Sequence, residues 1–413
     1  MVTLRCNQKF KHVSATLPAS KSISNRQLII RELTKGAHPY QFLSEAEDTV
    51  ILQKCLKDFR HSTRLDAGQA GTAYRFLTAF LATQDGEWDL GCSERMKERP
   101  LFPLVDALRL LGAGIDYLQR EGFPPVHIKG RKLEGGRVVV DAGISSQFIS
   151  ALLLIAPTLR DGLDLELTGQ IASQPYIEMT VQLMKGTGAQ VEWKDHTIKV
   201  APSEYIGGPY IGEADWSAAA FFYEMACISD ALEMNLPSLK RPSLQGDSRC
   251  AELWEPLGLK TRDTLMGVSL ERKEKITPEI TADFLDVPDL FIPFACSCAA
   301  RQVKLIATGL RNLSIKESDR LTATGTELTR LGYACEVLNE NTFILYPESR
   351  MAPSVTPVIK TYGDHRIAMA FAVLAAQLGE IRLDDLSCTA KSYPGFLKTL
   401  QQMGFTIEEG ESS

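Results

Sequence analysis

Six stretches of the sequence share one pattern, a head of small or polar residues followed directly by an apolar run with the length of a helix. They begin at residues 19, 70, 143, 213, 287 and 363, so that successive starts are 51, 73, 70, 74 and 76 residues apart. A period of about 70 residues is long for a solenoid but suits a supersecondary unit of a few strands and two helices. The repeat therefore predicts an α/β protein of six units, split three and three.

Strand-like segments separate these heads. They are short and β-like, and they include residues 136–143, 164–170, 190–200, 335–347 and 381–387. Several are followed by a second amphipathic run that ends at glycine, as helix C-caps do. No low-complexity linker marks a boundary between the two predicted halves, so we expect the chain to cross between domains through ordinary short segments.

Composition excludes several classes of protein. The chain has 413 residues, 44% of them hydrophobic and 23% charged, which is the balance of a soluble globular protein. Its net charge of −6 argues against a nucleic-acid surface. The apolar stretches are too short to span a bilayer, and the N-terminus lacks the apolar core of a secretory signal. Nine cysteines without a CxxC pair favour reduced thiols in a cytoplasmic protein, and no histidines have zinc-ligand spacing.

The first head, residues 17–26, contains cations beside serines where a helix is expected to begin. Ser22 and Arg26 are four residues apart and would share one helix face, and the free N–H groups of a helix start favour an anion. Lys and Arg at a helix end are more often solvated surface. The stretch by itself is therefore compatible with half of an anion site and with an exposed helix end.

The second head is a glycine-rich turn with Arg75 in the first turns of the helix that follows. It lacks the Gly-Lys-Ser/Thr of a nucleotide P-loop, which disfavours a Walker site. Close packing of backbone at the turn explains the glycines equally well.

Two further segments concentrate cations. Residues 95–99 carry Arg95, Lys97 and Arg99, whose repulsion must be relieved by anions or by neighbouring glutamates. In the second segment, Lys316 and Arg320 are four residues apart, and an ordinary charged helix surface explains that spacing as well as a site does. The last head contains Asp364, His365 and Arg366 directly before an apolar run. A helix that is buried on nearly all sides should place its few polar groups at a functional or exposed end.

Asp283, Asp286 and Asp289 lie at three-residue spacing before the fifth apolar run. A metal site is disfavoured, because Pro288 interrupts a continuous helix and no further carboxylate or histidine completes a cage. The segment leaves two alternatives: one of these carboxylates acts as a base, or it caps the helix of the apolar run. If the six heads pack around common axes, their cations line one cleft, which predicts small substrates carrying phosphate and carboxylate charges.

Eight ordered motifs identify a family. The chain resembles the EPSP synthases (3-phosphoshikimate 1-carboxyvinyltransferases) from about residue 17 to about 400, through the motifs LPASKSISNR, AGTAYRFL, RMKERP, SSQFISALLL, SQPYIEMT, KESDRL, DHRIAMAF and CTAKSYP. The resemblance implies two similar domains, 19–213 and 1–18 with 214–413, each of three βαβαββ units in an inside-out α/β barrel, with the active site in the cleft between them.

The resemblance also implies the reaction, which transfers the enolpyruvyl group of phosphoenolpyruvate to the 5-hydroxyl of shikimate 3-phosphate without metal or cofactor. We expect a monomer in the cytoplasm. The residues carried over for shikimate 3-phosphate are Lys21, Ser22, Arg26, Ser145, Ser146, Gln147, Ser173, Tyr176, Asp289, Asn312 and Lys316. Those for phosphoenolpyruvate are Lys21, Gly71, Arg95, Gln147, Arg320, Arg366 and Lys391. Glu317, with Lys21, is the expected proton donor and Asp289 the expected base.

The sequence departs from the family pattern at Gln69, Phe76 and Gln174. Gln174 replaces a cation near the shikimate end, whereas Gln69 and Phe76 would alter the phosphoenolpyruvate end. Two alternatives remain. A UDP-N-acetylglucosamine enolpyruvyl transferase shares the fold and uses a cysteine, and Cys92 lies suggestively close to the cation run. A non-catalytic relative would bind shikimate 3-phosphate without turnover.

Overall fold

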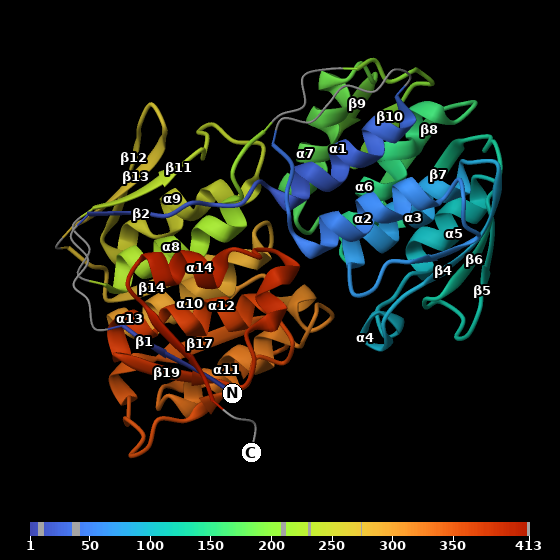
Figure 1. Ribbon diagram of the computed structural model, residues 1–413. Helices are drawn as coiled ribbons and strands as arrows, with labels where there is room; N and C mark the ends of the chain where they lie inside the picture. The colour runs from blue at the N-terminus through green and yellow to red at the C-terminus, as the bar shows by residue number, and fades with distance from the viewer. Residues whose placement is uncertain (7–11, 35–41, 208–211, 230–232, 274, 411–413) are drawn as a thin grey trace. The chain divides into compact units, whose positions relative to one another are not determined.

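The computed structural model describes residues 1–6, 12–34, 42–207, 212–229, 233–273 and 275–410 (Figure 1). The chain divides into two compact units, which we call unit 1 (Met1–Ser20 and Glu213–Ser413) and unit 2 (Lys21–Gly212). The sequence prediction places the boundaries at 19 and 213. Unit 2 is thus inserted into the chain of unit 1.

Five four-stranded sheets form in the described part of the chain, and all have one pattern. In four of them the first two strands along the chain are parallel, and the fourth pairs antiparallel with the second and the third. In the fifth, β18 and β19 are the parallel pair and the N-terminal β1 takes the place of the fourth strand. A helix follows each of the first two strands, as a parallel crossover requires. This is the βαβαββ unit that the family resemblance implies, and the described residues form five of the six predicted units as four-stranded sheets.

Unit 2 contains two of these sheets. Their strands are β3 (Arg64–Asp66), β4 (Gly86–Gly91), β5 (Gly114–Tyr117), β6 (Val126–Gly130), β7 (Gly136–Asp141), β8 (Leu163–Thr168), β9 (Val191–Lys194) and β10 (Thr197–Val200), in the orders β3-β4-β6-β5 and β7-β8-β10-β9. The helices are α1 (Lys21–Leu33), α2 (Glu47–Asp58), α3 (Gly71–Ala82), α4 (Glu94–Lys97), α5 (Phe102–Leu110), α6 (Ser146–Ile155) and α7 (Gln174–Gly186), with a 3₁₀ turn, η1, at Ala156–Thr158.

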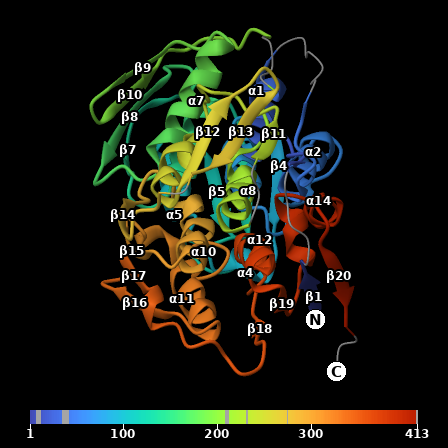
Figure 2. The ribbon, with the colours of Figure 1, turned by 90° about the vertical axis from the view of Figure 1, so that its left-hand side faces the viewer.

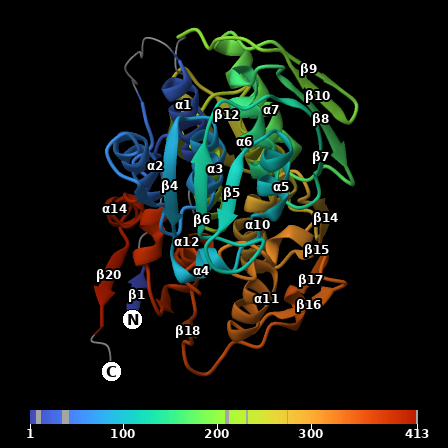
Figure 3. The same ribbon diagram turned by 90° about the vertical axis from the view of Figure 1, so that its right-hand side faces the viewer.

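Helices α3 and α6 form the centre of unit 2. Every residue of α3 is buried except Thr72, and every residue of α6 except Gln147. Figure 3 shows β4, β6 and β5 on the outer side of α3 and α6. Helices inside and sheets outside give the inside-out arrangement that the resemblance implies, and no closed barrel of strands occurs among the described residues.

Unit 1 contains three sheets, two of which are completed by strands from the N-terminus. Their orders are β12-β13-β11-β2, β14-β15-β17-β16 and β18-β19-β1-β20. The strands are β1 (Val2–Arg5), β2 (His12–Ser14), β11 (Glu233–Pro237), β12 (Leu259–Asp263), β13 (Gly267–Arg272), β14 (Glu279–Asp283), β15 (Lys304–Thr308), β16 (Ala334–Leu338), β17 (Thr342–Tyr346), β18 (Val358–Ile359), β19 (Glu380–Leu383) and β20 (Thr406–Glu409). Because β1 pairs with β19 and β20, the two ends of the chain close one unit together.

Three buried helices, α8 (Trp216–Ile228), α10 (Phe291–Arg301) and α12 (His365–Val373), form the core of unit 1. Figure 2 shows the strands β11, β12 and β13 in front of α8, and β14 to β17 beside α10. The remaining helices are α9 (Cys250–Leu253), α11 (Arg320–Arg330), α13 (Ala375–Leu378) and α14 (Phe396–Gln402). Short 3₁₀ turns are η2 (Gly246–Arg249), η3 (Glu255–Leu257), η4 (Pro288–Leu290), η5 (Arg311–Leu313), η6 (Pro347–Ser349) and η7 (Ser387–Lys391).

Polar residues of the heads begin the buried helices, as the sequence predicts. Asp215 accepts hydrogen bonds from Ser217 N and Ala218 N, and Asp364 accepts one from Arg366 N. Ser145 accepts one from Gln147 N. These caps satisfy amide groups that have no partner within the helix. No helix in the described residues has the length and apolar character needed to cross a membrane.

A buried acid in α8 has no partner. Glu224 has no solvent exposure, and neither of its carboxyl oxygens has a hydrogen-bond partner among the described residues. Burial raises the pKa of Glu224 well above its ordinary value. The side chain is therefore neutral in the folded protein at neutral pH.

Glu224→Gln is expected to stabilise the protein more as the pH rises. The unfolded chain loses this proton above a pH of about 4.3, whereas the folded chain keeps it, so the wild-type carboxyl lowers stability as the pH increases. The amide removes that dependence. Thermal melts at pH 5 and pH 8 should show a larger gain in Tm for the variant at pH 8. An equal difference at both values would contradict a neutral Glu224.

Candidate active site

Arg320 is the centre of a buried ionic cluster in unit 1. It is the first residue of α11, and its side chain is 2% exposed. Its guanidinium donates from Nη1 to Asp289 Oδ1 at 2.9 Å, from Nη2 to Glu317 Oε2 at 2.9 Å and from Nε to Asp364 Oδ2 at 2.8 Å. A buried charge is tolerated when it is paired and hydrogen-bonded. One guanidinium therefore holds three carboxylates in place.

Two more cations complete this cluster. Arg366 Nη2 lies 2.7 Å from Asp289 Oδ2, and Lys391 Nζ lies 3.5 Å from Glu317 Oε1. Both cations are buried. Asp289 consequently lies between two arginines and Glu317 between an arginine and a lysine. We call Asp289, Glu317, Arg320, Asp364, Arg366 and Lys391 the Arg320 cluster.

Charge determines the protonation states in the cluster. Burial alone would raise the pKa of Asp289, but Arg366, Lys316 and Arg320 together hold that pKa well below its ordinary value. Burial alone would lower the pKa of Arg320, and Asp364, Glu317 and Asp289 raise it above its ordinary value. Asp289 is thus an ionised acceptor at neutral pH.

Helix starts and turns position these side chains. Asp289 lies in η4, the turn between β14 and α10, which confirms that Pro288 interrupts a continuous helix. Asp364 caps α12 and Ser318 Oγ donates to its Oδ2 at 3.0 Å. Lys316 and Asn312 are half-buried and lie just before α11, Asn312 in η5. The predicted residues of unit 1 therefore come from heads that are distant in sequence.

Arg26 occupies a different environment in unit 2. It is buried in α1 and donates from Nε to Thr180 Oγ1 at 2.7 Å, and from Nη2 to Ser150 Oγ and to the Tyr176 carbonyl, both at 3.1 Å. Nη1 donates to the Ser22 carbonyl at 2.9 Å. All of these partners are neutral, and burial lowers the pKa of Arg26 to about 10. Arg26 still carries its positive charge at neutral pH, which favours an anion nearby.

Two further buried arginines, Arg75 and Arg99, lie beside Gly71, where α3 begins. A Cβ atom at this glycine would lie 2.5 Å from Arg99 Nη1 and 3.1 Å from Arg75 Nη1. Arg75 Nη1 in turn donates to Gln147 Oε1 on α6. A side chain at this position would shift the Arg99 guanidinium, which is the far end of a flexible side chain. Gly71 and Gln147, both predicted site residues, are brought to the same place.

The three cations of the 95–99 run have different environments. The Arg95 side chain is 46% exposed and pairs with Glu98, and Lys97 pairs with Glu94 at 2.5 Å. Arg99 is buried beside Gly71. Arg99 thus lies beside Gly71, and the predicted Arg95 has an exposed side chain.

The serines of unit 2 lie at helix starts. Ser145 caps α6 and Ser146 is its first residue, while Ser173 precedes α7 with a left-handed backbone, φ 55°. A serine rarely adopts this conformation, which is a local strain often found at functional sites. Lys21, the first residue of α1, pairs with the buried Asp48 at 3.0 Å.

The structure also shows the surroundings of the three residues that depart from the family pattern. The Phe76 ring lies 5.6 Å from the guanidinium carbon of Arg26, whereas the sequence prediction places Phe76 at the other substrate. Gln174 Nε2 donates to Glu178 at 2.8 Å. Gln69 is exposed.

Sequence reasoning missed several polar residues of these two sites. Asp48, which pairs with Lys21, lies outside the family motifs. Ser150 and Thr180, which bind Arg26, lie within the motifs SSQFISALLL and SQPYIEMT but were not assigned a role. Asp364 was noted only as part of a polar helix start. No local signal identifies them, because each acquires its role through a contact distant in sequence.

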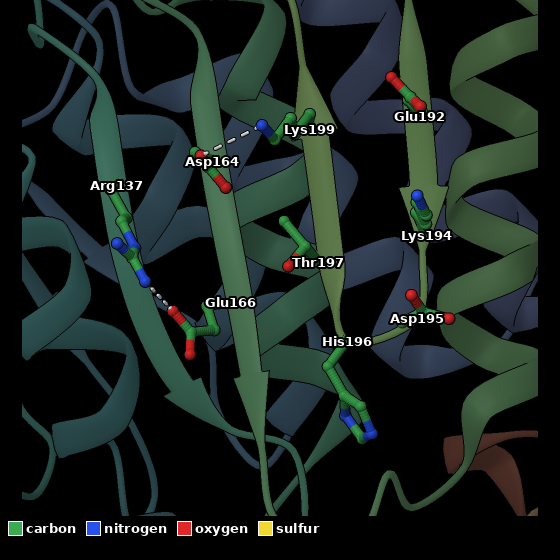
Figure 4. Close-up of a pocket in the computed structure, with 9 residues that line it drawn as sticks. All are labelled: Arg137, Asp164, Glu166, Glu192, Lys194, Asp195, His196, Thr197 and Lys199. Carbon is green, nitrogen blue, oxygen red and sulfur yellow. Dashed lines mark hydrogen bonds and ion pairs between the residues drawn. The ribbon is translucent and has the colours of Figure 1, made fainter.

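A pocket on the outer surface of unit 2 is separate from these residues. It has a volume of about 460 Å³ and lies across β7, β8, β10 and β9, where Arg137 pairs with Glu166 and Lys199 with Asp164 (Figure 4). Its lining consists of Arg137, Asp164, Glu166, Glu192, Lys194, Asp195, His196, Thr197 and Lys199. None of the predicted site residues lines it. The mixed charges of this open face do not select one ligand.

Cys92 is protonated. Burial raises its pKa to about 12, so at neutral pH it is a thiol and not a thiolate nucleophile. Among the described residues, no three or more His, Cys, Asp or Glu side chains form a group able to hold a metal ion.

The fold and the charged groups define a class: a two-unit α/β protein with repeated βαβαββ units, in which each unit holds buried cations suited to small polyanions. The model of the EPSP synthase (3-phosphoshikimate 1-carboxyvinyltransferase) family matches residues 39–400. The chain belongs to this family, which confirms the resemblance found in the sequence.

The names of similar proteins agree with this family assignment. The chain is 44% identical over 396 residues to a 3-phosphoshikimate 1-carboxyvinyltransferase of Bacteroides fragilis, with 96% of each chain covered. It is 34% identical over 416 residues to one of Xenorhabdus nematophila, covering 94% of this chain and 95% of the relative. The solved EPSP synthase of Acinetobacter baumannii shares the fold, with a TM-score of 0.79, 22% identity and 99% of each chain covered.

Proposed function

We propose that the protein transfers the enolpyruvyl group of phosphoenolpyruvate to the 5-hydroxyl of shikimate 3-phosphate and releases phosphate. The observation that carries this proposal is the Arg320 cluster, where an ionised carboxylate, Asp289, is fixed between two arginines next to Glu317. An acceptor for a proton and a second carboxyl group within one set of cations are what the reaction requires.

Shikimate 3-phosphate is the proposed ligand of Arg26. This buried guanidinium has neutral partners, so a phosphate group would supply the missing negative charge through a strong charge-assisted hydrogen bond. Ser22 and Tyr176 contribute backbone partners of Arg26 and are therefore fixed beside it. The full proposed set comprises Lys21, Ser22, Arg26, Ser145, Ser146, Gln147, Ser173, Tyr176, Asp289, Asn312 and Lys316.

Phosphoenolpyruvate is the proposed ligand of the cations at Gly71 and of the Arg320 cluster. Its proposed set comprises Lys21, Gly71, Gln147, Arg320, Arg366 and Lys391. The set also includes the predicted Arg95, which is exposed and pairs with Glu98, and we add Arg99, which is buried beside Gly71.

The proposed chemistry is a proton-coupled addition followed by elimination. Glu317, with Lys21, protonates the methylene carbon of phosphoenolpyruvate, the 5-hydroxyl oxygen bonds to the adjacent carbon, and Asp289 takes the hydroxyl proton. Loss of a methyl proton and cleavage of the carbon–oxygen bond to phosphate then restore the double bond. The fixed cations offset repulsion between two polyanionic substrates and orient them.

Phosphate release by the purified full chain tests the proposal. Phosphate should appear with phosphoenolpyruvate and shikimate 3-phosphate together, and not with UDP-N-acetylglucosamine as the acceptor. Release from phosphoenolpyruvate with UDP-N-acetylglucosamine as the acceptor, and not with shikimate 3-phosphate, would favour the related transferase. Binding of shikimate 3-phosphate by calorimetry without any phosphate release would favour a non-catalytic relative.

Cys92→Ser is expected to leave kcat and KM within about twofold of the wild type. The thiol is protonated, and a serine hydroxyl of similar size preserves the local contacts. The phosphate-release assay measures both constants. A loss of activity of about a hundredfold or more would assign Cys92 a direct role in the reaction.

Gly71→Ala is expected to raise the KM for phosphoenolpyruvate by about tenfold, while kcat changes less. The added Cβ would lie 2.5 Å from Arg99 Nη1, so this guanidinium must move, and one displaced charge-assisted bond is equivalent to about a tenfold loss of affinity. Gly186→Ala, at the end of α7, is the control, because a Cβ there meets no atom within 4 Å and φ is not positive. An unchanged KM in Gly71→Ala would remove Arg99 from the site.

A further inference from the structure

A strained turn leads into α12, the helix that carries Arg366. The Asp364 amide donates to the Thr361 carbonyl at 2.9 Å, and the two residues between them, Tyr362 and Gly363, both have positive φ values, 55° and 63°. This hydrogen bond and these angles are those of a type I′ turn, whose central positions are dominated by glycine, asparagine and aspartate. A tyrosine in this conformation is strained, and such strain persists only where the surrounding contacts enforce it.

A buried carboxylate on α11 supplies this constraint. Glu327 has no solvent exposure, and its Oε1 accepts a hydrogen bond from the Tyr362 hydroxyl at 2.7 Å. Its Oε2 accepts one from the Lys360 amide at 3.1 Å, and Arg330 Nε lies 3.2 Å from Oε1. A hydroxyl bound to a charged carboxylate makes one of the stronger hydrogen bonds found in proteins. We call the contact between Tyr362 and Glu327 the Tyr362–Glu327 latch.

Helix α11 holds the start of α12 at two points. Arg320 and Glu327 are seven residues apart, about two helical turns, and therefore lie on the same face of α11. Arg320 donates to Asp364, the last residue of the turn. Glu327 accepts from Tyr362, two residues earlier. Because Asp364 also caps α12 through the amide of Arg366, the turn determines where both of these side chains are placed.

We propose that Tyr362 is a positioning residue of the enzyme, because the latch keeps the strained turn in the form that places Asp364 and Arg366. The inference rests on the proposed function, in which Arg366 binds phosphoenolpyruvate. Tyr362 itself is 42% exposed, and neither the family motifs nor the proposed mechanism gives it a role. Its effect should be selective for phosphoenolpyruvate, whereas shikimate 3-phosphate, assigned to Arg26 in unit 2, should bind as before.

Tyr362→Phe in the full chain removes only the hydroxyl and tests the inference. The KM for phosphoenolpyruvate should rise by about tenfold, the effect of one lost hydrogen bond to a charged group, while kcat and the KM for shikimate 3-phosphate stay within about twofold. Phosphate release measures all three constants. Tyr346→Phe is the matched control and should change none of them, because the Tyr346 hydroxyl also donates to a glutamate of unit 1, Glu336, at 3.3 Å, but lies outside the turn.

Tyr362→Asn separates the strain from the hydrogen bond. Asparagine is too short to reproduce the latch, but it adopts positive φ readily and with Gly363 forms the Asn-Gly pair preferred in type I′ turns. Its KM for phosphoenolpyruvate should therefore stay within about threefold of the wild type.

Hydrogen exchange gives a second readout that needs no substrate. Backbone amides of residues 361–366, followed by mass spectrometry, should exchange about tenfold faster in Tyr362→Phe and at nearly the wild-type rate in Tyr362→Asn and Tyr346→Phe.

An unchanged KM for phosphoenolpyruvate in Tyr362→Phe, with only a lowered Tm, would overturn the inference in favour of a purely structural role. Equal losses in Tyr362→Phe and Tyr362→Asn would overturn it as well, because they would not come from strain in the turn. If Tyr362→Phe does not fold, a tenfold rise of the KM in Tyr362→Asn would contradict the inference.

A wild type that releases no phosphate would instead overturn the proposed function and, with it, the effect on substrate affinity. In that case faster exchange of residues 361–366 in Tyr362→Phe would still support the latch, and unchanged exchange would overturn the latch too.

Discussion

Asp289→Asn is expected to lower kcat for phosphate release by about a thousandfold, within the range that a general base contributes. The amide has nearly the same shape but cannot take the hydroxyl proton. It also removes one of the carboxylates that neutralise Arg320 and Arg366, which are hydrogen-bonded to Asp289 at 2.9 and 2.7 Å. Steady-state kinetics at saturating concentrations of both substrates measures the effect.

Asp286→Asn is the control for this substitution. Asp286 lies three residues earlier and is half-exposed. This variant should keep kcat within about twofold, as surface changes usually have small effects. If Asp289→Asn retained more than about a tenth of the wild-type kcat, another group would have to be the base, and Asp289 would serve only to hold the arginines.

Arg320→Met is expected to destabilise the protein by about 3–5 kcal/mol. The variant would leave Asp289, Glu317 and Asp364 without their common partner, and Asp364 has no solvent exposure. Removal of one member of a buried ionic cluster leaves charges that are neither solvated nor paired. The urea concentration at the midpoint of unfolding, followed by circular dichroism, reports the change.

Two comparisons make this result specific. Arg311→Met, at an exposed position in η5, should change stability by less than about 0.5 kcal/mol. Adding Asp364→Asn to Arg320→Met should recover part of the loss, because it removes one of the uncompensated charges. A midpoint that is unchanged in Arg320→Met would show that water or a neighbouring group replaces the guanidinium without cost.

Local patterns predicted the elements of the fold well. All six heads precede buried helices, and the strand-like segments at 136–143, 190–200 and 335–347 overlap the strands β7, β9, β10, β16 and β17. Caps such as Asp215 and Ser145 act on amides two or three residues away. An apolar run that follows a cap becomes a buried helix wherever it packs, so these features could be found without knowing the fold.

Local patterns could not distinguish between equivalent cations. Arg95 and Arg99 lie in the same run, yet Arg95 pairs with Glu98 in solvent, while Arg99 is buried against Gly71. Phe76 follows Arg75 in sequence, but its ring lies against Arg26. The sequence places these residues correctly on their helices and gives no information about which neighbour they meet.

Short stretches of the chain were enough to predict the six heads, the helix starts and the family, because caps, periodicity and ordered motifs are local properties. The partners of the site residues depend on the tertiary fold. It joined the N-terminal strands to the sheets of unit 1 and gathered Asp289, Glu317, Arg320 and Arg366 into one cluster. The physical reason is that burial and Coulomb interaction depend on distance in space, which residues far apart along the chain acquire only when the repeats pack.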